Sequence, residues 1–145
     1  MGTEYAQFRE WNFDDSLEWF MTDYPIHSDF RLYVKSLNEL YLANEELWEL
    51  DFSPSGFEWI YPDLANENLV AYKRKNKRGE ELIFVISFNG SDISIDIPHN
   101  DGERLEVVFE TTFGTAKVDK TALKLNRLSG AVLRLTDGSV KIKRK

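Results

Sequence analysis

The sequence contains no cysteine, and this absence excludes several classes of protein at once. Without thiols the chain has no disulfide framework, no cysteine nucleophile and no cysteine-based metal site. Only two histidines are present, His27 and His99, and their separation along the chain fits no zinc-binding pattern. We therefore expect no metal ion and no cofactor.

Long hydrophobic runs are absent as well. No apolar stretch approaches the roughly 20 residues that a membrane-spanning helix needs. The first residues, Met1 to Glu4, show neither the basic start nor the apolar middle of a signal peptide. These features predict a protein of the cytoplasm that does not associate with membranes.

Positive charge is scarce in the first part of the chain. Residues 1 to 67 hold 15 acids and 3 bases, whereas residues 68 to 145 hold 10 acids and 15 bases. The uneven distribution favours two structural regions. A chain with a net charge of −7 does not suit nonspecific binding to nucleic acid, because contacts to phosphates need clustered cations.

One long segment, Asp29 to Leu50, has the period of an amphipathic helix. Ser28 or Asp29 can cap its start, and Pro54 disfavours a helical residue before it. Its apolar residues recur at steps of three and four: Phe30, Tyr33, Val34, Leu37, Leu40, Tyr41, Leu47 and Trp48.

From Phe57 onward the period changes to short alternating runs between turn residues, which predicts an antiparallel sandwich or barrel. Residues 81–88 are apolar on both faces, so we expect a central strand that forms a hairpin with residues 69–74. We interpret Thr111 to Thr121 as a polar loop and the basic stretch Lys73 to Arg78 as a solvated hairpin tip. The predicted strands are 57–61, 69–74, 81–88, 93–97, 105–110, 122–125, 131–135 and 140–143.

Several segments carry a resemblance to a known family. They are MGTEYAQFREWN at residues 1–12, SLEW at 16–19, LWELDF at 47–52 and GFEWI at 56–60. In this order and spacing they resemble the carboxyl-terminal part of bacterial 1,4-α-glucan branching enzymes, of the α-amylase superfamily. In that family the first segment follows the last strand of a catalytic (β/α)8 barrel, and a helix then leads into an all-β domain.

The resemblance implies a parent enzyme, a glycosyltransferase of glycogen biosynthesis. It cuts an α-1,4 bond in a glucan and transfers the released chain to a sugar O6, forming an α-1,6 branch. The reacting carboxylates of the family lie on earlier barrel strands, so we assign no catalytic residue to this chain. The partners implied are an α-glucan and the missing catalytic barrel.

The resemblance also implies a set of substrate-binding residues. Barrel enzymes build their sites from loops at the carboxyl ends of the strands, and residues 4–11 resemble the loop that leaves the final strand. We therefore expect Gln7, Arg9, Glu10 and Trp11 at the rim of a glucan cleft. Without the barrel, we expect residues 1 to about 28 to be weakly anchored.

The sequence thus predicts a mainly β chain: an antiparallel β-sandwich of the α-amylase carboxyl-terminal type, preceded by a loop and helix from the end of a (β/α)8 barrel. The boundaries are 1–52 for the end of the barrel and 55–145 for the sandwich. Two alternatives stay open: a free-standing carbohydrate-binding module, and the terminal domain of another α-amylase superfamily enzyme.

Overall fold

The computed structural model of the chain describes residues 1–10, 12–112 and 114–137. The chain forms two compact units, the first of which is Met1–Asn44 and the second of which begins at Glu45. Within the described residues, no helix has the length and apolar character needed to cross a bilayer. Each unit has its own internal packing and is described separately below.

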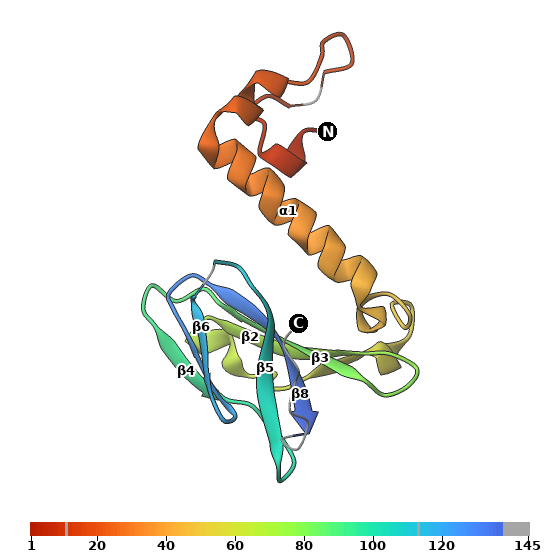
Figure 1. Cartoon of the computed structure of the whole chain (residues 1–145), viewed down its shortest axis with the longest axis vertical. Coiled ribbons are helices and arrows are strands. Elements are labelled where there is room, and N and C mark those ends of the chain that lie inside the picture. The colour runs from red at the N-terminus through yellow and green to blue at the C-terminus, as the bar shows by residue number, and fades with distance from the viewer. Residues whose placement is uncertain (11, 113, 138–145) are drawn as a thin grey trace, which may run out of the picture. The chain divides into compact units, whose positions relative to one another are not determined.

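The described residues of the first unit form one α-helix and two short 3-10 helices (Figure 1). The 3-10 helices are η1 (Thr3–Tyr5) and η2 (Trp19–Asp23), and both contact the long helix α1 (Pro25–Ala43).

Helix α1 begins four residues earlier and ends seven residues earlier than the sequence pattern predicts. Pro25 occupies its first turn, where the fixed φ of proline suits a helix and its missing N–H is not needed. Asn44 ends it: the Asn44 Nδ2 atom donates to the Leu40 carbonyl oxygen at 2.7 Å, while the Asn44 backbone is extended. Ser28 and Asp29 lie inside the helix and not at its cap.

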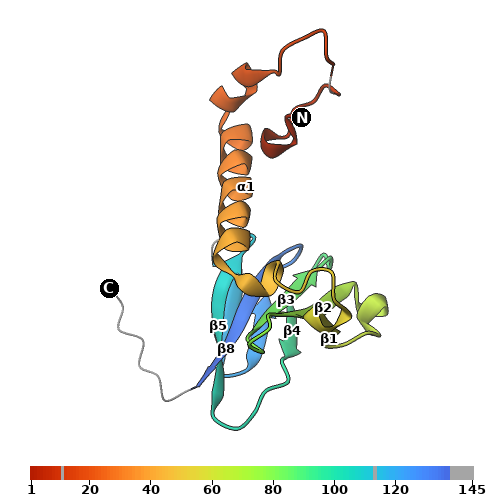
Figure 2. The same ribbon diagram turned by 90° about the vertical axis from the view of Figure 1, so that its right-hand side faces the viewer.

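The second unit is an antiparallel β-sandwich, as expected (Figures 1 and 2). A five-stranded sheet has the order β1-β2-β3-β8-β5, and a three-stranded sheet has the order β4-β7-β6. The strands are β1 (Phe57–Trp59), β2 (Leu69–Lys75), β3 (Glu81–Ser87), β4 (Ile93–Asp96), β5 (Glu103–Glu110), β6 (Ala116–Asp119), β7 (Ala122–Leu125) and β8 (Gly130–Asp137). Three short 3-10 helices complete it: η3 (Glu45–Leu47), η4 (Pro54–Gly56) and η5 (Leu64–Glu67).

The core lies between the two sheets. Its buried side chains alternate along each strand, so that every second residue of β2, β3 and β8 faces inward. Burial of each large aliphatic side chain contributes about 1.5–3 kcal/mol to folding. The buried members are Leu69, Ala71, Ile83, Val85, Ile97, Leu105, Leu123, Leu125, Ala131 and Leu133.

Most predicted strands are confirmed, with shifts of one or two residues at their ends. The prediction that 81–88 forms a central strand is also confirmed, because β3 is the middle strand of the five-stranded sheet. The interpretation of 111–121 as a loop is wrong, because β6 lies within it and pairs with β7. The predicted strand 140–143 lies outside the described residues.

Candidate functional site

The predicted substrate-binding residues belong to a loop that is folded against the start of α1. Tyr5 is completely buried, and its ring centroid lies 5.5 Å from that of Trp19. The buried His27 donates from Nδ1 to the Tyr5 carbonyl oxygen at 2.8 Å. The loop thus packs on its own helix, which differs from the expectation that residues 1 to 28 are weakly anchored.

Gly2 allows this loop to close on itself. Its φ is +80°, a conformation that side chains with a Cβ rarely adopt. A Cβ built on Gly2 would also lie 2.8 Å from the Gln7 Oε1 atom, closer than real carbon contacts. The Gln7 N–H donates to the Gly2 carbonyl oxygen at 3.0 Å, so the chain returns to Gly2 within five residues.

Gln7 lies at the centre of the loop's polar contacts. Its Oε1 atom accepts from the Tyr5 hydroxyl at 2.7 Å and from the Glu18 N–H at 3.0 Å. Its Nε2 atom donates to the Arg9 carbonyl oxygen at 2.9 Å. An amide nitrogen carries two hydrogens, so one donor of Gln7 is left over from these contacts.

Arg9 and Glu10 are exposed. The Arg9 Nη1 atom lies 3.0 Å from the Asp15 Oδ2 atom, and both side chains are about half exposed (54%). An ion pair in such a setting contributes about 1 kcal/mol or less. Arg9 can therefore exchange its partner for a ligand at little cost. Trp11, the fourth predicted residue, lies outside the described residues.

The structure brings three of the four predicted residues together around one small hollow. Gln7, Arg9 and Glu10 line a cavity of about 10 Å³ together with Asp15 and Glu18, among others. This volume is near the minimum for a single water molecule. The described residues of this loop therefore present polar groups on its surface, and the cavity that they line is too small for a sugar.

Sequence reasoning did not find Asp15 and Glu18 as members of this group. Both follow the predicted segment by several residues, and they reach it only because the chain turns back after Asn12. The side-chain oxygen of Asn12 accepts from the Asp14 N–H at 3.1 Å, which is a local turn signal that the sequence does contain.

The basic stretch Lys73 to Arg78 is not merely a solvated hairpin tip. Acids from residues 45–58 pair with it, so the solvated interpretation is incomplete. The pairs are Arg74–Asp51 at 2.8 Å, Lys75–Glu58, Lys77–Glu49 at 3.4 Å and Arg78–Glu45 at 2.9 Å. These contacts fix the segment before β1 to the hairpin of β2 and β3.

Two pKa shifts follow from this pairing. Hydrogen bonds to Glu58 and Glu81 raise the pKa of Lys75 above its ordinary value. The Lys77 N–H, which donates to the Glu49 carboxylate at 2.9 Å, lowers the pKa of Glu49. Both shifts favour the charged forms, as is usual for paired charges.

Aromatic side chains form a row across the outer face of the five-stranded sheet. Trp59 is opposite Tyr72, and Tyr72 is opposite Phe84. The rings of Tyr72 and Phe84 are stacked at 4.9 Å and 4°, and Phe57 stacks on Tyr72 at 5.3 Å. Rings stacked in this way contact one another through their faces, so the inner members of the row do not offer those faces to a ligand.

Across the parts of the chain that the structure describes, no three His, Asp or Glu side chains gather in a way that could hold a metal ion. His27 is occupied by the Tyr5 carbonyl, and the His99 Nδ1 atom lies 3.0 Å from the Ile97 carbonyl oxygen.

The amino-acid sequence is similar to those of known enzymes. No family model matches it. It is 40% identical over 104 residues to the 1,4-alpha-glucan branching enzyme of Oceanobacillus iheyensis, and the alignment covers 69% of this chain and 16% of the relative. It is 42% identical over 86 residues to the branching enzyme of Aquifex aeolicus, which covers 59% of this chain and 14% of the relative. The chain therefore spans about one sixth of the length of these relatives.

Comparison with solved structures supports the fold. The pullulanase of Group B Streptococcus is similar with a TM-score of 0.63 and 13% identity, over 83% of this chain and 18% of that one. The isomaltulose synthase of Klebsiella sp. LX3 gives a TM-score of 0.57 and 18% identity, over 77% of this chain and 18% of that one. At such identities the likeness concerns the fold alone. In sequence the chain is thus similar to part of the bacterial 1,4-alpha-glucan branching enzymes, and in fold it is similar to part of the pullulanase and part of the isomaltulose synthase.

Proposed function

We propose that this chain is the carboxyl-terminal part of a cytoplasmic 1,4-α-glucan branching enzyme. The parent enzyme transfers an α-1,4-glucan segment to a sugar O6 and so forms the α-1,6 branches of glycogen. The observation that carries the proposal is the 40% identity over 104 residues to a branching enzyme of which this chain spans 16%. The comparisons do not favour a free-standing binding module.

In this proposal residues 1–52 complete the catalytic barrel and residues 55–145 form the terminal β domain, and residues 45–52, which pack with the second unit, connect the two. Exposed apolar side chains on the first unit support a missing partner: Phe8 is 84% exposed, Ile26 is 75% exposed and Leu42 is 74% exposed. A unit of this size that exposes several large apolar side chains suits a surface that a partner covers. The family resemblance implies that the catalytic barrel is the partner that covers these side chains.

The experiment uses the parent polypeptide. We expect a shortened parent polypeptide that lacks residues 1–145 of this chain to be insoluble or inactive on amylose. Its barrel would lack the final loop and helix. Supplying residues 1–145 as a separate chain should restore part of the activity. Full branching by the shortened polypeptide alone would contradict the structural role.

Within the parent enzyme we propose that Gln7, Arg9, Glu10 and Trp11 lie at the rim of the glucan cleft. Arg9 and Glu10 are exposed and polar, so they can bond sugar hydroxyls. Gln7 holds the loop and keeps one donor for a sugar oxygen. The indole of Trp11 would stack on a pyranose ring.

Kinetics of the parent enzyme test this rim. Arg9→Ala and Trp11→Ala should each weaken glucan use by roughly 1–3 kcal/mol in kcat/KM, with little change in melting temperature. Lys35→Ala is a matched control, since Lys35 is an exposed base on α1. A Trp11→Ala variant that melts far lower while its folded fraction keeps normal kinetics would make Trp11 a packing residue.

A further inference from the structure

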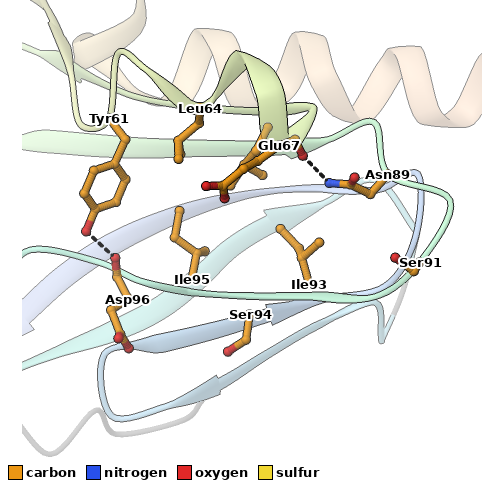
Figure 3. A pocket seen from close by; sticks show the side chains of 10 residues that line it. Tyr61, Leu64, Glu67, Asn89, Ser91, Ile93, Ser94, Ile95 and Asp96 are labelled. Carbon is orange, nitrogen blue, oxygen red and sulfur yellow. Dashed lines mark hydrogen bonds between the residues drawn. The ribbon is translucent and has the colours of Figure 1, made fainter.

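A recess in the described part of the second unit lies along the free edge of β4. It has a volume of about 590 Å³ and is bounded by the segment 61–69 on one side and by residues 89–96 on the other (Figure 3). We call it the β4 groove. Its volume falls in the range of sites that bind small molecules.

The floor of the groove is aliphatic. Leu64 projects from one side, and Ile93 and Ile95 project toward it from β4 (Figure 3). The buried Leu69 also lines the groove. These side chains continue into the core, so the floor is fixed by packing and is ready for a ligand with an apolar face.

The edge of β4 supplies main-chain polar groups to the groove. Successive residues of an antiparallel strand direct their N–H and C=O groups to opposite sides. The Ile97 N–H bonds to Thr121 on the β7 side, whereas the Asp96 carbonyl oxygen accepts from the Tyr61 hydroxyl at 2.8 Å on the groove side. Ser94, two residues before Asp96, therefore directs its N–H and C=O toward the groove.

Side chains along the rim add hydrogen-bonding groups. The Asn89 Nδ2 atom donates to the Glu67 carbonyl oxygen at 2.6 Å, which joins the two walls (Figure 3). The carboxylates of Glu67 and Asp96 and the hydroxyl of Ser91 are exposed. They accept hydrogen bonds from the hydroxyl groups of a ligand.

The charge of the lining selects the ligand class. The described lining contains two acids and no base. Phosphate and carboxylate ligands are therefore repelled, and a hydroxyl-rich neutral molecule fits best. A pyranose ring combines a C–H face for the aliphatic floor with hydroxyls for the rim.

We propose that the β4 groove is a binding site for an α-1,4-glucan segment, separate from the loop of residues 1–24. The choice of glucan among neutral sugars rests on the proposed function. The competing ligand is a peptide that adds a strand to the edge of β4. The Asp96 carbonyl oxygen on this edge already accepts from the Tyr61 hydroxyl, so an added strand would have to displace that hydroxyl. A sugar needs no such displacement.

The test is an NMR titration of the chain with maltohexaose, followed at the backbone amides. The proposal predicts saturable shifts at residues 61–69 and 89–96. Glu67→Gln, which keeps the size of the side chain, should weaken this binding by roughly three- to tenfold. Glu106→Gln is the matched control, because Glu106 is an exposed acid on β5 outside the groove, and it should leave the affinity unchanged.

Three results would overturn the proposal: no groove shifts at saturating maltohexaose, equal weakening by both variants, or groove shifts with an extended peptide but not with the glucan. Branching by the parent enzyme is assayed separately. If the groove binds maltohexaose but the parent enzyme forms no branches, only the proposed function is overturned. If the parent enzyme forms branches but the groove binds no maltohexaose, only the proposed binding site is overturned.

Discussion

At the scale of single residues, Gln7 determines how the loop of the first unit is held. One side chain bonds to Tyr5, Glu18 and Arg9, so it joins residues from both ends of the loop. Each such bond contributes about 0.5–1.5 kcal/mol, and a buried hydroxyl left without its acceptor costs more.

We predict that Gln7→Ala lowers the stability of the first unit by about 1–3 kcal/mol. Amide hydrogen exchange along residues 3–23 is the measurement, and exchange there should become much faster. Arg9→Ala is the control, since the exposed Arg9–Asp15 pair is worth about 1 kcal/mol or less. Equal effects of the two variants would show that Gln7 does not hold the loop.

These residue roles could be predicted only in part. The sequence places Gln7, Arg9 and Glu10 close together because they are neighbours in the chain. It does not show that Tyr5 is buried or that Gln7 bonds to Glu18. Those contacts depend on left-handed backbone at Gly2 and at Ala6, with φ values of +80° and +56°. Alanine in this conformation is uncommon, so no sequence rule predicts it.

At the scale of elements, Arg74 holds the segment before β1 to the sheet. Its Nη2 atom donates to the Leu47 carbonyl oxygen at 3.2 Å and to Asp51 at 2.8 Å, and its Nε atom donates to the Gly56 carbonyl oxygen at 3.1 Å. The planar guanidinium reaches three acceptors at once, which a lysine ammonium cannot reproduce with the same geometry.

Arg74→Lys should therefore lower the free energy of unfolding by about 1–2 kcal/mol although the charge is unchanged. Chemical denaturation of the chain measures this loss. The matched change Arg104→Lys, at an exposed position on β5, should be close to neutral. A neutral Arg74→Lys would mean that the charge alone matters.

Glu110 organises the turn that leads from β5 into β6. Its Oε1 atom accepts from the Gly114 N–H at 2.7 Å, and its Oε2 atom accepts from the Ala116 N–H at 2.9 Å. Burial alone would raise the pKa of this carboxyl, but the N–H groups of Gly114, Ala116 and Thr115 together bring it below the ordinary value. The folded state thus favours the charged form.

A lowered pKa in the folded state fixes the sign of the pH dependence. The stabilisation from Glu110 is present above the ordinary glutamate pKa of about 4.3, and it is lost as the pH falls through the lower folded-state value. We predict that Glu110→Gln destabilises the chain by about 1–3 kcal/mol at pH 7 and much less at pH 2–3. Urea unfolding at both pH values measures this. A constant difference between variant and native chain would contradict the role of the charge.

Periodicity explains which elements could be predicted from the sequence. The hairpin of β2 and β3 has two apolar runs and a turn at Asn76 and Gly79, and it is found where expected. Strand β6 has only Ala116 and Val118 facing the core. This alternation of apolar and polar residues is too weak to predict a strand from the sequence. Its position is fixed by Glu110 and by pairing with β7, and both are tertiary contacts.

At the scale of the whole molecule, the change of charge along the sequence does not coincide with the boundary between the two compact units. The compact units divide at Asn44 and Glu45, not at the change of charge near residue 67. Acids between residues 45 and 58 lie in the second unit and pair with its bases. The buried Glu46 likewise pairs with Arg134 at 2.9 Å. The excess of acid between residues 45 and 67 therefore reflects complementary surfaces inside the second unit, whereas the acids of residues 1–44 belong to the first unit.

The family resemblance could be found from short motifs, whereas the β4 groove could not. REWN and GFEW are contiguous in the sequence and need no fold to be recognised. The groove is formed by Leu64 and Glu67 of η5 and Ile95 of β4, two elements that are far apart in the sequence and meet only in the folded unit.

The most direct test of the central claim is the number of α-1,6 linkages formed in amylose, measured by proton NMR. The same assay is applied to this chain alone and to the parent polypeptide that contains it. We predict no new linkages with the chain alone, since the family resemblance implies that the reacting carboxylates lie outside it, and steady branch formation with the parent. Branch formation by the pure chain, or a well-folded parent that forms no branches, would contradict the account.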